Sequence, residues 1–209
     1  YEYFIRKAAG LGKSPTERDP DIYDHSYYHC DVLIVGAGPA GLIAALTAGL
    51  CGARVLLVDM DTEPGGSLLS SDVRIDSRFA MQWVDDVVSE LDSKPNIVRL
   101  SRSTATGYFN DNYVTVVEES PDKPWVRERL WKVRAKRVIL ATGAIERPLV
   151  FANNDKPGVM LASAALTYCW RYAAMPGRVA VVFTNNNSGY RHAIGLARLG
   201  VVVRALIDT

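Results

Sequence analysis

The sequence predicts an α/β fold in which parallel strands are supplied by two successive strand–helix–strand units. Three observations support this prediction. Residues 31–59 have the pattern of a buried strand, a glycine-rich turn, a helix and a second strand. Residues 179–208 repeat that pattern, and in both units the helix region lies between glycines 11 positions apart: Gly41 and Gly52, then Gly189 and Gly200. Between the units, short apolar runs separated by turn residues predict a β-meander.

The other elements follow from periodicity along the chain. Residues 1–11 are typical of a short amphipathic helix, and an extended segment continues to residue 30. Apolar side chains recur at helical spacing from Phe79 to Leu91, which predicts a helix there. Strands are expected at residues 97–100, 105–109, 113–118, 126–133 and 137–141, then a helix at 159–172, and in the second unit a strand at 179–183, a helix at 189–199 and a strand at 201–208.

Composition excludes several kinds of partner. With 48% hydrophobic and 22% charged residues, the chain resembles an ordinary globular protein that buries a sizeable core. Its 24 Lys and Arg balance 23 Asp and Glu, so charge recruits neither nucleic acid nor an anionic membrane. The uncharged run at residues 32–53 is long enough to cross a bilayer. Pro39 would break such a helix near its middle, so no membrane span is expected.

Cysteine and histidine usage predicts neither disulfides nor a metal site. Cys30, Cys51 and Cys169 are scattered and include no C-x-x-C pair, which favours a reducing compartment, here expected to be the cytoplasm. His25, His29 and Cys30 are close in sequence, but they lack a fourth ligand and a helix that would align them. No nucleophile–base set or acid pair stands out either, so no catalytic residue is predicted.

A G-x-G-x-x-G motif joins the first strand to the first helix: Gly36, Ala37, Gly38, Pro39, Ala40 and Gly41. The first glycine allows the tight turn, the second lets a pyrophosphate approach the backbone, and the third lets the helix pack against the strand. The N-terminus of the helix offers N–H groups and partial positive charge to the phosphates. This context predicts a dinucleotide-binding site.

Asp59 follows the second strand, 18 residues after the last glycine of the motif. Its carboxylate is expected to accept hydrogen bonds from the adenosine ribose and to repel a 2′-phosphate, which favours NAD or FAD over NADP. NAD and FAD present the same ADP group, so FAD remains the alternative to NAD at this site. Further contacts are expected from Met60, from Gly65, Gly66 and Ser67, and from Thr142 and Gly143. A simple turn explains the Gly65-Gly66 pair equally well.

The second unit departs from the motif. Thr184 and Asn186 stand where the first two glycines would be, and only Gly189 remains. We therefore expect a packed unit without a ligand. The domain boundaries expected are 1–30 for the N-terminal helix and extended segment, 31–157 for the first dinucleotide-binding domain with its meander, and 158–209 for a helix and the degenerate second unit. Together these features predict a Rossmann-like, two-dinucleotide-domain flavoprotein architecture.

Several stretches resemble the α subunits of heterotetrameric sarcosine oxidases. The matching stretches are residues 1–12, 29–41, 65–69, 141–154, 157–162 and 181–186, of which 141–154 (ATGAIERPLVFANN) is the most specific. The likeness covers essentially the whole chain, although that family's α subunit is several times longer. Related α-type subunits occur in opine oxidases and hydrogen cyanide synthase.

The resemblance implies a multi-subunit oxidase acting on CH–NH donors, which converts sarcosine to glycine with tetrahydrofolate as one-carbon acceptor. In that family the α subunit binds NAD, carried over here to Gly36, Gly38, Gly41 and Asp59, while the flavin chemistry involves a β subunit, which is joined by smaller subunits. The isolated chain is therefore expected to be non-catalytic. The alternative is an FAD-binding, NADH-dependent reductase of the two-dinucleotide-domain kind, with NADH at the second unit.

Overall fold

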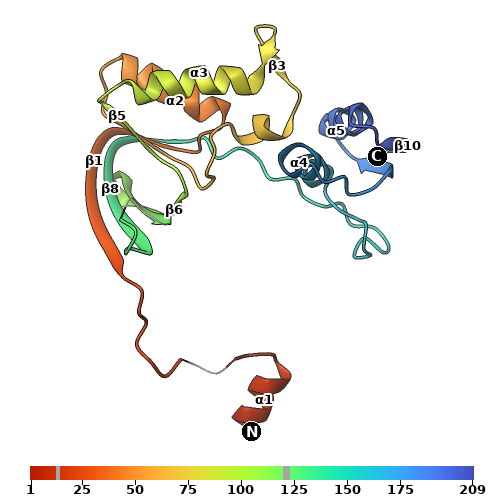
Figure 1. The fold of residues 1–209 in the computed structure, drawn as a ribbon, viewed down its shortest axis with the longest axis horizontal. Helices are drawn as coiled ribbons and strands as arrows, with labels where there is room; N and C mark the ends of the chain where they lie inside the picture. Colours follow the sequence, from red (N-terminus) through yellow and green to blue (C-terminus); the bar gives the residue numbers. More distant parts are fainter. Residues whose placement is uncertain (13–14, 120–122) are drawn as a thin grey trace.

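The computed structural model describes residues 1–12, 15–119 and 123–209, and a six-stranded mixed sheet organises most of this chain (Figure 1). The strand order is β5-β2-β1-β8-β7-β6. The first four run parallel to one another: β5 (Ile97–Leu100), β2 (Val55–Val58), β1 (Tyr23–Val35) and β8 (Glu128–Leu140). β7 (Tyr113–Glu119) and β6 (Ser103–Phe109) continue the sheet in antiparallel pairing, with the 3-10 turn η2 (Asn110–Asn112) between them. The predicted α/β class and the meander are confirmed.

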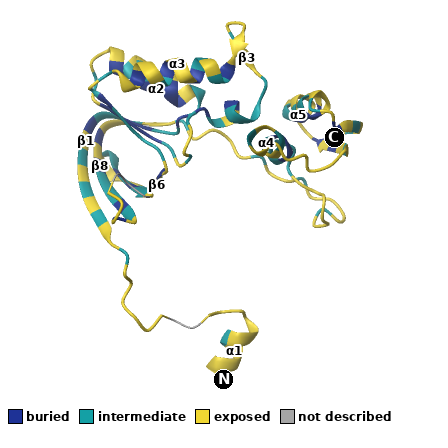
Figure 2. Cartoon of the chain, viewed as in Figure 1, coloured by how far each residue is buried: buried dark blue, intermediate teal, exposed yellow. Residues whose placement is uncertain are grey.

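Two helices cover one face of the parallel strands. α2 (Pro39–Leu50) and α3 (Ala80–Asp92) lie side by side there, and Figure 2 shows their buried residues turned toward the sheet. All four residues of β2 are buried, as expected of a strand covered on both faces. On α3 the buried positions repeat every three to four residues, so the helix predicted from the apolar spacing is confirmed; they are Ala80, Val84, Val87 and Leu91.

The meander covers the opposite face. β1 and β8 are each 13 residues long, and they curve together so that β7 and β6 fold back toward the parallel strands (Figure 1). A second core cluster fills the space between the two parts of this curved sheet, with Leu33 and Leu56 on one side and Val114, Val116 and Val133 on the other. Both faces of the first strand–helix–strand unit are therefore buried, which places its binding groups at the strand ends.

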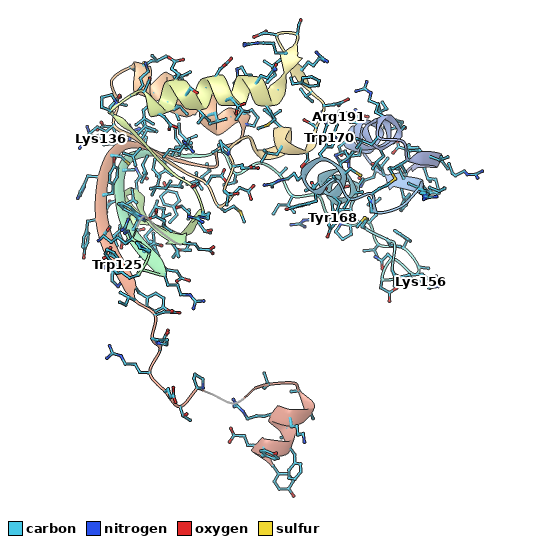
Figure 3. All side chains as sticks on the ribbon, viewed as in Figure 1. Trp125, Lys136, Lys156, Tyr168, Trp170 and Arg191 are labelled. Atoms are coloured by element: carbon cyan, nitrogen blue, oxygen red, sulfur yellow. The ribbon has the colours of Figure 1, made fainter. Side chains whose placement is uncertain are left out.

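The long pairing of β1 with β8 corrects two expectations. β8 is one strand where two were expected, at residues 126–133 and 137–141, and β1 includes residues 23–30 of the expected N-terminal segment. The two strands pair in parallel from Tyr23 opposite Glu128 to Val35 opposite Leu140, so the ladder extends through the charged stretch 134–137. Within that stretch Ala135 is buried, whereas Lys136 projects outward (Figure 3). Charges on one face of a strand do not interrupt it.

A short helix precedes the sheet. The helix expected at residues 1–11 is present as α1 (Glu2–Ala8), none of whose residues is buried. It lies away from the rest of the molecule (Figure 1). None of the helices in the described ranges is both long and apolar enough to cross a membrane.

The second strand–helix–strand unit forms as expected. β9 (Val179–Thr184) and β10 (Val202–Asp208) pair in parallel, and α5 (Asn187–Arg198) connects them. α4 (Ala162–Tyr172) precedes the unit and packs on α5 through a small core that includes Leu166 and Leu196. α4 also contacts the 3-10 helix η1 (Gly66–Ser70), which is followed by the hairpin of β3 (Arg74–Ile75) and β4 (Arg78–Phe79).

Candidate functional site

The glycine-rich loop lies where two neighbouring parallel strands end. Gly36 follows β1 and donates its N–H to the carbonyl of Val58 at the end of β2 (2.8 Å). Ala141 follows β8 and donates to the carbonyl of Val35 (2.8 Å). The loop is thus held between β2 and β8 at the carboxyl edge of the sheet, where open α/β sheets bind their ligands.

The glycines at the two ends of the motif are required by the fold itself. Gly36 has a φ of +105°, and a Cβ there would lie 2.3 Å from the carbonyl oxygen of Ala141. A Cβ at Gly41 would lie 1.7 Å from the carbonyl oxygen of Gly36, because α2 packs directly on the loop. Neither position can carry a side chain without displacing backbone.

Gly38 is different, because nothing in the surrounding protein requires a glycine there. Its φ of −70° is open to any residue. A Cβ added at Gly38 would meet nothing nearer than the Cα of Gly66, at 3.9 Å, which is ordinary van der Waals contact. The space beside Gly38 is therefore available to a group from outside the chain.

The N-terminus of α2 points its first N–H groups into the same region. Gly38 is the N-cap, no side chain caps the helix, and the first turn carries no acidic residue. Pro39 supplies no N–H and its fixed φ suits the first helical position. Ala40 and Gly41 therefore present N–H groups that have no partner within the helix. An anion placed at this end would find donors and the positive end of the helix dipole.

Asp59 faces the loop from the end of β2. One carboxylate oxygen accepts a hydrogen bond from the N–H of Ala37, and the other accepts from the N–H of Asp61 (2.8 Å). The backbone of Asp59 is held as well, because its N–H donates to Leu100 (3.0 Å) and its carbonyl accepts from Ser103 (2.7 Å). Asp59 is thus oriented by the protein, with lone pairs left for further donors.

The glycine pair after β2 brings a second segment against the loop. The N–H of Gly65 donates to the carbonyl of Ala37 (2.8 Å). Both glycines have positive φ, +128° for Gly65 and +54° for Gly66, and a Cβ at Gly66 would lie 2.9 Å from the Cα of Gly38. The pair therefore forms a turn and also permits close approach of two backbones. Ser67, within η1, is exposed.

The remaining predicted contact residues lie around this loop to different degrees. Thr142 and Gly143 directly follow Ala141 beside Gly36, and both are exposed, with φ +72° at Gly143 and open space around it. Met60 is 72% exposed on the far side of Asp59. The sequence analysis missed two residues that shape the loop, Ala141 and Asp61. Both act through backbone atoms, which leave no residue-type signal.

The corresponding loop of the second unit is filled by its own side chains. A Cβ at Gly189 would lie 2.3 Å from the hydroxyl of Thr184, which also accepts from the N–H of Asn186 (3.2 Å). The Asn186 side chain caps α5 by accepting from the N–H of Ser188 (2.9 Å). The donors that α2 leaves open are therefore engaged at α5.

The cysteines and histidines do not gather into a site. Cys30 is buried in the meander core, and this burial raises the pKa of its thiol to about 11, so it is no nucleophile near neutral pH. His25 and His29 are exposed on the other face of β1. Among residues 1–12, 15–119 and 123–209 there is no group of three side chains arranged to hold a metal ion.

Comparison with known proteins places this geometry among redox proteins. The family model described as pyridine nucleotide-disulphide oxidoreductase matches residues 30–204. The α subunit of the sarcosine oxidase from Rhizobium meliloti (strain 1021) is 49% identical over 100% of this chain, which spans 22% of that protein's length. The first subunit of the opine oxidase from Agrobacterium tumefaciens (strain Ach5) is 31% identical over 86% of this chain and 37% of its own length.

Solved structures agree on the fold. The L-proline dehydrogenase from P. horikoshii superposes with a TM-score of 0.70 and 28% identity, over 88% of this chain and 36% of that one. The Lactococcus lactis thioredoxin reductase gives a TM-score of 0.57 at 18% identity, over 86% of this chain and 64% of that one, and shows the fold alone. These similarities confirm the predicted fold and the resemblance expected from the sequence.

Proposed function

This chain belongs to the pyridine nucleotide-disulphide oxidoreductase family, and from that premise we propose that its first strand–helix–strand unit binds the ADP half of NAD. The residues assigned to this role are Gly36, Ala37, Gly38, Pro39, Ala40, Gly41, Asp59, Met60, Gly65, Gly66, Ser67, Thr142 and Gly143.

The unfilled space at Gly38 carries this proposal. The glycines on either side of it are needed by the fold, whereas Gly38 satisfies neither a backbone nor a packing requirement of the chain. A pyrophosphate beside Gly38 would need the missing side chain and would also meet the open N-terminus of α2. The residues present therefore fit a dinucleotide.

Asp59 supports NAD or FAD over NADP. Its carboxylate lies at the end of β2, oriented toward the loop by the N–H groups of Ala37 and Asp61. There it would accept from the adenosine ribose hydroxyls and repel a 2′-phosphate. When bound, a nicotinamide dinucleotide supplies hydride transfer, and the protein's part is to bind and orient it. FAD at the same loop remains the alternative.

We further propose that the chain forms part of a multi-subunit oxidase acting on CH–NH donors. The chain spans about a fifth (22%) of the sarcosine oxidase α subunit it matches. Oxidative demethylation of sarcosine to glycine, linked to tetrahydrofolate, is the activity proposed for the whole assembly. A β subunit would carry the flavin, and smaller subunits would join it. In this scheme residues 31–157 are the binding domain, residues 158–209 begin a second unit, and the setting is the reducing cytoplasm. The isolated chain would be non-catalytic.

Titration of the chain with NAD and with ADP, together with its visible spectrum, tests the proposed ligand. We expect one site per chain for either compound and no absorption band in the visible range, because NAD is colourless there. A yellow protein that releases FAD on denaturation would assign FAD to the loop and revive the reductase alternative. If NAD, ADP and FAD all fail to bind, the proposed site is wrong.

An oxidase assay tests the division of labour between subunits. Sarcosine-dependent hydrogen peroxide production should be absent from the 209-residue chain, even with added flavin, and should be present when the full-length polypeptide is combined with its flavin-carrying partner. Peroxide production by the chain alone would show that the catalytic chemistry had been assigned to the wrong polypeptide.

A further inference from the structure

We propose that Arg171 on α4 is a positioning residue for the dinucleotide site, because it holds the acidic turn that orients Asp59. The inference rests on the proposed function of the glycine-rich loop and adds to it a residue outside the first strand–helix–strand unit. Arg171 follows Asp59 by more than a hundred positions in sequence, and no motif marks it.

Arg171 contacts two carboxylates in the segment that follows β2. Its Nη1 lies 3.8 Å from an oxygen of Asp61, and its Nη2 lies 3.7 Å from an oxygen of Glu63. The Arg171 side chain is only 22% exposed, so the guanidinium is partly withdrawn from water. Screening by solvent is weaker there than for a fully exposed pair.

Asp61 transmits this contact to the site. Its N–H donates to Asp59, whose other carboxylate oxygen accepts from the N–H of Ala37 in the glycine-rich loop. Arg171, Asp61, Asp59 and Ala37 thus form a continuous series of polar contacts from α4 to the loop. A shift of the turn at Asp61 would withdraw a donor from the carboxylate expected to bind ribose.

Charge gives this turn a reason to move when Arg171 is absent. Asp59, Asp61 and Glu63 place three carboxylates within five residues, and the proposed ligand adds a pyrophosphate nearby. Like charges at this spacing repel one another, and a partly buried guanidinium offsets that repulsion. Arg171 therefore stabilises the shape of the turn in which Asp59 faces the loop.

α4 is anchored in a way that presents Arg171 to the turn. Thr167 is one helical turn earlier on the same face, and its hydroxyl donates to the hydroxyl of Ser70 at the end of η1 (3.1 Å). η1 begins at Gly66, which lies against Gly38. Tyr168 and Trp170, by contrast, leave α4 on opposite sides (Figure 3). The helix face that carries Thr167 and Arg171 thus borders the segment surrounding the site.

A second ion pair supplies a matched control. Arg198 on α5 lies 2.5 Å from Asp72, and so it too joins the second unit to the segment after β2. Within the described part of the chain, the polar contacts of this pair do not include the turn at 59–63. Arg198→Met removes an ion pair between the same two parts of the chain without disturbing Asp61.

The test compares Arg171→Met, Arg171→Lys and Arg198→Met with the unchanged chain in two measurements. Without ligand, the amide N–H groups of Asp61 and Ala37 should exchange faster only in Arg171→Met. With ADP as the probe, that variant should bind about three- to fivefold more weakly, the scale of a lost ion pair. Arg171→Lys should restore most of both effects, and Arg198→Met should change neither.

The two measurements separate this inference from the proposed function. If exchange and ADP affinity in Arg171→Met match those of Arg198→Met, or if the lysine variant is as impaired as the methionine variant, Arg171 does not position the turn. If the unchanged chain binds neither ADP nor NAD, the proposed function fails. Exchange at Asp61 then still decides whether Arg171 holds the turn.

Discussion

Replacing Gly38 by alanine should weaken dinucleotide binding while leaving the stability of the chain nearly unchanged. The added Cβ lies 3.9 Å from its nearest protein neighbour, and the φ of −70° suits alanine. Loss of unfolded-chain entropy favours alanine by about 0.4–1 kcal/mol, whereas alanine is a poorer N-cap than glycine by a similar amount. The net change in the free energy of unfolding should stay within about 1 kcal/mol.

Binding should respond much more strongly than stability. A Cβ placed where a pyrophosphate contacts the backbone overpacks that contact, which costs about 1–3 kcal/mol, or roughly 5- to 150-fold in affinity. Isothermal titration with NAD measures this loss, and urea unfolding of the same sample measures stability. Wild-type affinity for NAD in a folded Gly38→Ala variant would refute the argument that this space is reserved for ligand.

Gly36→Ala is the matched comparison, since it lies two residues away and should show the opposite pattern. Its Cβ would lie 2.3 Å from the carbonyl oxygen of Ala141, at a φ of +105°. Backbone strain and overpacking each cost about 1–3 kcal/mol, so this variant should lose stability before ligand is considered. If both variants lost the same stability, the distinction between fold-required and ligand-required glycines would be wrong.

Three further predictions concern the acid, the second unit and the response to pH. Asp59→Ala should weaken NAD binding by about 1–3 kcal/mol and relax the rejection of NADP, and competitive titration would contradict this role if NADP were still excluded. Asn186→Ala should leave the NAD stoichiometry at one per chain by calorimetry, because its amide caps α5; two sites in the unchanged chain, with one lost in the variant, would restore the reductase hypothesis. Hydrogen bonds from the Arg54 side chain hold the pKa of Asp31 below its ordinary value, and Lys136 adds to the effect. The stability that Asp31 contributes is therefore present above the unfolded carboxyl pKa of about 4 and is lost as pH falls below it. Urea unfolding from pH 6 to 3 should show a shallower decline for Asp31→Asn, and parallel curves would contradict this assignment.

The first unit was predictable from sequence because its determinants are local. The run from the strand before Gly36 to Asp59 contains its own turn, helix start and acid, so spacing alone predicts the geometry. The degenerate second unit was legible for the same reason, at Thr184 and Asn186. Periodicity also located α3, since only one of its faces is apolar.

The long strands β1 and β8 were not predictable, because their continuity depends on each other. The charged stretch 134–137 interrupts the apolar pattern, and only pairing with β1 shows that it continues the same strand. Tertiary structure also decided which glycines the fold requires. Gly36 and Gly38 look equivalent in the motif, but only the position of Ala141, brought alongside by the β1–β8 pairing, distinguishes them.

The sequence by itself determined the class of fold, the place of the dinucleotide loop and the acid that faces it. These depend on residues close together in the chain, whose spacing constrains their geometry. Tertiary structure alone decided that Arg171 lies beside Asp61, that Gly66 lies against Gly38, and that α5 is closed by its own cap. Such contacts join separate segments or depend on side-chain orientation, and neither spacing nor periodicity encodes them.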